Sequence, residues 1–144
     1  MPSCTYAATA DLTGAANYQD LWWRKPGASE SGWGINLNHQ GDTIFATWFT
    51  YDLAGSPLWL VVTAPKTAPG VYAGDLYRTS GARFDAFSSG DVVPLKVGTA
   101  TFTFTDGNNA TFDYTVQLAG MASPLTQSKA ITREIFATGG TTCR

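Results

Sequence analysis

The sequence predicts an all-β fold, an eight-stranded antiparallel up-and-down barrel, with a two-sheet β-sandwich as the alternative. The first observation is composition: the 144 residues are 44% hydrophobic but only 14% charged, with eight Phe, six Tyr and five Trp. Helix surfaces are usually built from Glu, Lys and Ala, whereas Thr and aromatic residues suit a pleated sheet. The second is short apolar runs that alternate with polar residues and are separated by turn residues at regular spacing. Closure into a barrel also removes the edge strands that such runs would expose.

Four predicted strands make up the first half of the chain. Strict period-two alternation, typical of a strand with one buried face, runs from Trp33 to Gln40. The following run, Thr43 to Tyr51, is apolar on both faces, which predicts a strand covered on both sides or one carrying a surface aromatic patch. The four expected strands span residues 20–24, 33–40, 43–51 and 58–63.

The second half repeats this pattern, with one longer connection at residues 80–94. The Asp106–Asn109 segment predicts a hairpin loop, because Asp, Gly and Asn tolerate a positive φ. The expected strands span residues 71–79, 99–105, 110–118 and 129–137.

The barrel is predicted as a single domain at residues 18–137, between an N-terminal tail (1–17) and a C-terminal tail (138–144). A disulfide between Cys4 and Cys143 would tie the two tails together, and two free thiols are the alternative. The disulfide implies an oxidising compartment, so we expect a secreted, periplasmic or cell-surface protein. The first residues lack a basic and an apolar region, so Met1 is interpreted as a start that replaces a removed signal peptide.

Several classes of function are disfavoured by charge and residue inventory. A net charge of −2 without a basic cluster predicts no nucleic-acid partner. The sequence contains no run of about 18 apolar residues, so we expect no membrane span. We expect no cofactor, because no Gly-rich phosphate loop is present. We expect no metal site, because His39 is the only histidine and the cysteines lack metal-ligand spacing. His39 is expected to be a solvated histidine beside a turn.

A carboxylate-dependent carbohydrate-active enzyme remains as a third hypothesis, because such enzymes need only two carboxylates. Glu30 lies in a predicted turn. Glu134 lies beside Arg133 in the last predicted strand, where a cross-strand or neighbouring ion pair on the barrel exterior is the preferred interpretation.

Aromatic residues are the strongest non-random feature, because all five Trp fall within residues 22–59. They either fill the barrel or form a stacking platform for a carbohydrate or a small apolar ligand. The predicted ligand-binding residues are aromatic side chains for stacking and two asparagines for hydrogen bonding: Trp23, Trp33, Trp48, Trp59, Tyr51, Asn36 and Asn38. The sequence thus favours a non-enzymatic binding or structural module. Self-assembly or adhesion through the same aromatic residues is the alternative.

Arg133 is the lone arginine of the last predicted strand. We expect it to stack on a tryptophan of the first strand and to close one end of the barrel. On this basis Arg133→Ala would cost about 1–3 kcal/mol through lost cation–π contact and packing.

The chain also resembles a known group of sequences. Trp22-Trp23, Glu30-Ser31-Gly32-Trp33-Gly34, Tyr51-Asp52 and Gly55-x-Pro57-x-Trp59 are similar to motifs of a module found in uncharacterised secreted bacterial proteins. The resemblance covers most of residues 18–136 and implies extracellular β structure, with no activity attached. By architecture alone, the predicted barrel is similar to lipocalins and avidins, but their Gly-x-Trp first strand is absent here.

Overall fold

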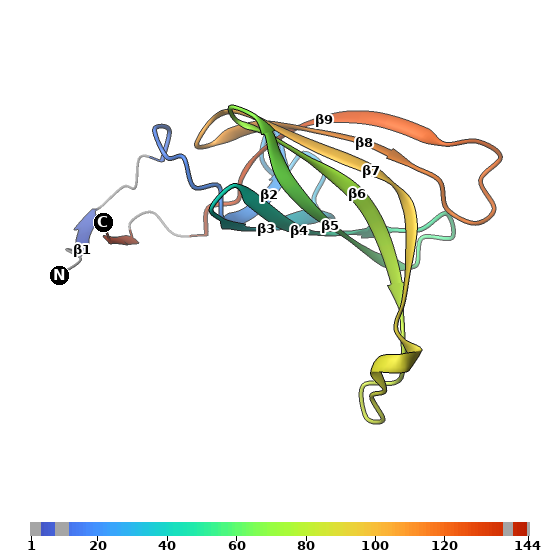
Figure 1. Ribbon diagram of the computed structural model, residues 1–144. Helices are drawn as coiled ribbons and strands as arrows, with labels where there is room; N and C mark the ends of the chain where they lie inside the picture. The colour runs from blue at the N-terminus through green and yellow to red at the C-terminus, as the bar shows by residue number, and fades with distance from the viewer. Residues whose placement is uncertain (1–3, 8–11, 137–139, 144) are drawn as a thin grey trace.

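The computed structural model describes residues 4–7, 12–136 and 140–143, and it confirms the predicted eight-stranded barrel (Figure 1). The barrel is closed and antiparallel, and each strand pairs with its neighbours in chain order until β9 pairs with β2. Its strands are β2 (Asp20–Arg24), β3 (Gly34–Gln40), β4 (Thr43–Tyr51), β5 (Pro57–Ala68), β6 (Val71–Ser80), β7 (Val93–Asp106), β8 (Asn109–Val116) and β9 (Leu125–Arg133).

Three strands differ from the predicted ranges by more than two residues at one end or both. β5 continues past residue 63, and Pro65 is tolerated because pairing with β4 ends at that residue. β7 begins at residue 93 rather than 99, because its first residues pair with β6 in a part of the predicted long connection. β9 spans 125–133 rather than 129–137, so it begins and ends four residues earlier than predicted.

The interior of the barrel is filled by side chains. Alternate residues of each strand point inward, as the period-two pattern requires, and they form one buried hydrophobic cluster. The Trp48 ring of β4 lies 5.1 Å from the Phe112 ring of β8, and Phe112 stacks on Phe102 of β7 at 5.0 Å. Because aromatic rings from β4, β7 and β8 meet in this way, the space left for a ligand lies on the outer wall or at the ends.

One end of the barrel, here called the turn end, carries the tight turns at residues 40–43, 68–71 and 106–109. Tyr18 closes it, with its ring 3.6 Å from the Phe104 ring and 5.5 Å from the His39 ring. The prediction of a solvated His39 is therefore wrong, since only 8% of this residue is exposed. Its Nδ1 accepts the Tyr18 backbone N–H at 3.1 Å, and its Nε2 lies 3.2 Å from the Tyr72 hydroxyl.

Arg133 also lies at the turn end and is almost fully buried. Its guanidinium carbon lies 5.2 Å from the Trp22 ring, which confirms the expected stacking on the first strand. It also bonds the carbonyls of Asn17, Gln19 and Gly107, and its Nη1 lies 3.0 Å from a carboxylate oxygen of Asp20. The expected ion pair of Glu134 is wrong, because its carboxylate makes no ion pair within the described residues and the buried Arg133 pairs with Asp20 instead.

The other end, here called the loop end, carries the longer connections at residues 25–33, 52–56 and 117–124. There the β6–β7 hairpin runs on past the barrel wall (Figure 1). In β6 pairing with β5 ends at Tyr77, and in β7 pairing with β8 ends at Gly98. The projecting segment, residues 78–96, is called the arm and contains the short 3-10 turn η1 (Ser89–Asp91).

A separate two-stranded sheet joins the chain ends. β1 (Cys4–Ala7) and β10 (Gly140–Cys143) pair antiparallel, with Cys4 opposite Cys143 in the register. Both strands lie in the segments that were predicted as tails. The side chains of the two cysteines lie outside the described part of the structure.

Candidate functional site

Four exposed aromatic side chains project from the outer wall on β4 and β5. Three of them are aromatic residues on the outward face of β4, whose other face carries the buried Ile44, Ala46 and Trp48. The fourth is a tryptophan of the neighbouring strand β5. We call this set the aromatic platform: Phe45, Phe49, Tyr51 and Trp59. Their exposed fractions lie between 43% and 53%, so about half of each residue is available to a partner.

The register of β4 and β5 determines how the platform is arranged. Phe49 lies directly opposite Trp59, and Tyr51 lies opposite Pro57. Along β4, Phe45 to Tyr51 spans about 20 Å at 3.3 Å per residue. The platform is therefore an elongated strip, widest at the Phe49–Trp59 pair and closest to the loop end at Tyr51.

Two shallow hollows flank Phe49. One, of about 200 Å³, is lined by Phe49, Tyr51, Pro57 and Trp59 together with Gly32, Thr50 and Leu58. The other, of about 290 Å³, lies across β3 toward β2 and is lined by Trp23, Trp33, Asn36 and Glu134 among others. Phe49 and Gly32 line both hollows, so the two form one continuous uneven surface.

Polar groups without a partner lie beside these rings. Within the described part of the chain, the side chains of Asn36, Asn38 and Glu134 make no hydrogen bond or ion pair. Asn36 and Glu134 line the second hollow, and Asn38 lies opposite Phe45 in the register. This part of the wall therefore offers apolar rings beside free hydrogen-bonding groups.

Glu30 braces the loop that borders the second hollow. Its Oε2 accepts a hydrogen bond from Lys129 Nζ at 2.6 Å and from Trp33 Nε1 at 2.9 Å, and its Oε1 lies 3.3 Å from Arg24 Nε. The hydrogen bond from Lys129, followed by that from Trp33, holds the pKa of Glu30 below its ordinary value of 4.5. A carboxyl group kept ionised in this way is poorly suited to be the proton donor of a glycosidase. The hydrogen bond that Glu30 accepts from Trp33 instead holds the Trp33 side chain in position.

The predicted binding residues are divided by the barrel wall. Trp59 and Tyr51 lie on the platform, and Asn36 and Asn38 lie beside it on β3. Trp23 and Trp33 are half-buried and line the second hollow. Trp48 is separated from all of them, because it points into the barrel and is only 7% exposed.

Sequence reasoning did not include Phe45, Phe49 and Glu134 in the site. The signal for the two phenylalanines was the apolar character of both faces of residues 43–51. Strand parity places Ile44, Ala46 and Trp48 on the other face. Once that face is recognised as the interior, Phe45 and Phe49 must be outside.

Among the described residues, no group of His, Cys, Asp and Glu is arranged to hold a metal ion. No helix in that part of the chain is long and apolar enough to cross a membrane.

Fold and surface together define the class: a packed, eight-stranded antiparallel barrel that carries an aromatic strip on its outer wall. Comparisons with family models, curated proteins and solved structures found no match to the chain. The resemblance to secreted bacterial modules stays a prediction.

Proposed function

We propose that the protein is a non-enzymatic binding module whose aromatic platform binds an extended carbohydrate chain. The observation that carries this proposal is the exposure of Phe45, Phe49, Tyr51 and Trp59 in one strip on a regular strand surface. Exposed aromatic groups gathered on one surface indicate a binding site rather than ordinary surface variation.

The chemistry of a pyranose ring matches this surface. One face of such a ring is lined by C–H groups and packs on an aromatic ring, while its edge carries hydroxyl groups that need hydrogen-bond partners. The free side chains of Asn36, Asn38 and Glu134 lie next to the strip and can supply these partners. A long, shallow strip fits several linked sugar rings better than one isolated sugar.

The packed interior further supports an external site. Small-molecule binding inside a barrel needs a cavity, and here the rings of Trp48, Phe102 and Phe112 occupy that space. An apolar ligand in the barrel centre is therefore disfavoured.

Calorimetric titration with cellohexaose, chitohexaose and xylohexaose tests the proposal. We expect the wild type to bind at least one of them, and Trp59→Ala to weaken that binding about tenfold or more, as expected for an exposed aromatic anchor. Because half of Trp59 is exposed, the variant should keep its melting temperature within a few degrees.

Phe87→Ala is the matched control, since Phe87 is an exposed aromatic residue (71%) on the arm and not on the platform. Binding by this variant should equal that of the wild type. No heat with any of the three sugars, or equal loss in both variants, would contradict the proposal. A concentration-dependent oligomer that Trp59→Ala dissolves would assign the platform to self-assembly instead.

We further propose that Cys4 and Cys143 form a disulfide and that the protein works in an oxidising compartment outside the cytoplasm. The register places the two residues directly opposite each other on β1 and β10. Opposed residues of antiparallel strands have Cα atoms about 4.5–5.5 Å apart, within the range that a disulfide spans.

Thiol alkylation of protein from an oxidising host checks this pairing. Without reductant, neither cysteine should be labelled, and with reductant both should be. Labelling of both without reductant would show that the thiols are free.

A further inference from the structure

We propose that the groove at the base of the arm is a second binding site, which takes a soluble amphiphile with an apolar chain and one carboxylate. The site is separate from the aromatic platform: it lies at the loop end, where β7 leaves β8, and it shares no residue with the two hollows beside Phe49.

The groove exists because β7 changes partners. From Gly98 onward β7 pairs with both β6 and β8, and before that residue it pairs with β6 alone. Val97 is the extra residue of a bulge between the Leu76–Gly98 and Tyr77–Lys96 pairs. Its carbonyl accepts a hydrogen bond from Gln117 N at 2.8 Å, just past the end of β8. Beyond this point β7 and the segment after β8 diverge, which leaves a wedge-shaped space.

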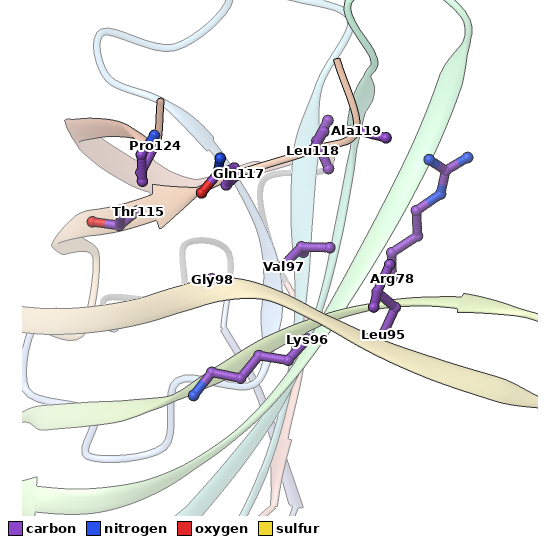
Figure 2. A pocket seen from close by; sticks show the side chains of 10 residues that line it. All are labelled: Arg78, Leu95, Lys96, Val97, Gly98, Thr115, Gln117, Leu118, Ala119 and Pro124. Atoms are coloured by element: carbon purple, nitrogen blue, oxygen red, sulfur yellow. The ribbon is translucent and has the colours of Figure 1, made fainter. Parts of the chain in front are cut away.

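The space is large and mostly apolar. Its volume is about 650 Å³, within the range of about 300–1,000 Å³ usual for small-molecule sites. Leu95 and Val97 form one side, and Leu118, Ala119 and Pro124 come from the segment that follows β8 (Figure 2). Leu95 is 60% exposed, so a partner that covered it would remove apolar surface from water.

One positive charge in this groove has no counterpart. Arg78 lies opposite Leu95 in the β6–β7 register and lines the groove. Figure 2 shows its side chain extending toward the side where Leu118 and Ala119 lie, whereas Lys96 points away across β7. Lys96 Nζ is already bound, at 2.8 Å from an Asp75 carboxylate oxygen.

Arg78 is exceptional in this respect. Every other lysine and arginine within residues 12–136 bonds a carboxylate, an amide oxygen or a backbone carbonyl of the protein. Arg78 alone among them makes no hydrogen bond or ion pair in the described structure. A guanidinium binds a carboxylate through paired hydrogen bonds, so the groove is complementary to a ligand with an apolar body and an anionic end.

Titration with decanoate, decanol and decyltrimethylammonium, all below their aggregation concentrations, tests this site. We expect the wild type to bind decanoate about tenfold more tightly than decanol, and the cationic amphiphile no better than decanol. Arg78→Gln should weaken decanoate binding about tenfold and leave decanol binding unchanged. Leu95→Ser should weaken the binding of both.

Arg83→Gln is the matched control, because Arg83 is an exposed arginine of the same arm that pairs with Asp85. It should bind decanoate like the wild type. Equal affinity for decanoate in Arg78→Gln and the wild type, equal loss in both arginine variants, or no binding of decanoate would overturn the proposal. Trp59→Ala should bind decanoate normally, so failure here and failure of the platform are distinguishable.

Discussion

Replacing Arg133 by Ala is expected to lower the free energy of unfolding by about 3–5 kcal/mol, the range for breaking a buried charged interaction. Its side chain is only 3% exposed, and its guanidinium holds three backbone carbonyls and one carboxylate at the turn end. Removal leaves those acceptors without their donor and takes away the contact with Trp22. Urea unfolding followed by tryptophan fluorescence measures the change.

This cost exceeds the 1–3 kcal/mol expected from the sequence, because the sequence suggested only the cation–π contact. Asp20→Asn is a suitable control, since the Asp20 side chain is 39% exposed and the ion pair alone is worth about 1 kcal/mol or less. If Arg133→Ala lost no more stability than Asp20→Asn, the carbonyl contacts would contribute nothing measurable.

Replacing Gly98 by Ala should destabilise the barrel by about 3 kcal/mol, as for a severe overpacking substitution. A Cβ at this position would lie 1.8 Å from the Thr115 carbonyl oxygen and 3.1 Å from the Val116 Cα, both in the backbone of β8. Backbone cannot move aside as a flexible side chain can, so β7 and β8 would have to separate where they diverge. Thermal unfolding and urea titration measure the effect.

Gly81→Ala provides the comparison on the arm. A Cβ there would meet its nearest neighbour, Val92 Cγ2, at 3.5 Å, which is ordinary contact. We expect a change within about 0.5 kcal/mol. A similar small change for Gly98→Ala would show that the two strands are not held so closely together.

The fold was largely predictable because its pattern is local. Alternation along residues 34–40 and 109–116, with turns between runs, specifies which side of each strand is buried. The extent of β7 was not predictable in this way. Its first residues, 93–96, are exposed and have a partner only because β6 extends equally far, and that pairing is a property of two segments together.

The site was less predictable, because it depends on which face of each strand is covered. Trp48 and Trp59 were predicted to belong to one binding site. The Trp48 side chain points into the barrel and the Trp59 side chain points outward, so the barrel wall separates them. His39 was misjudged for a related reason. Its position beside a turn suggested exposure, but Tyr18, from a segment without a periodic pattern, folds over it. A contact between segments that are distant in the sequence leaves no pattern in the residues around either of them.

The pairing of β2 with β9 has a consequence for how the protein folds during synthesis. Trp22 lies opposite Arg133, so the barrel closes only when residues more than a hundred positions apart meet. Until the last strand has emerged, β2 and β8 are open edges with unpaired backbone groups and exposed apolar faces. Such long-range pairing is slow to form, and the incomplete chain is prone to aggregate. A nascent chain that stops before β9 should therefore depend on chaperones far more than the finished protein.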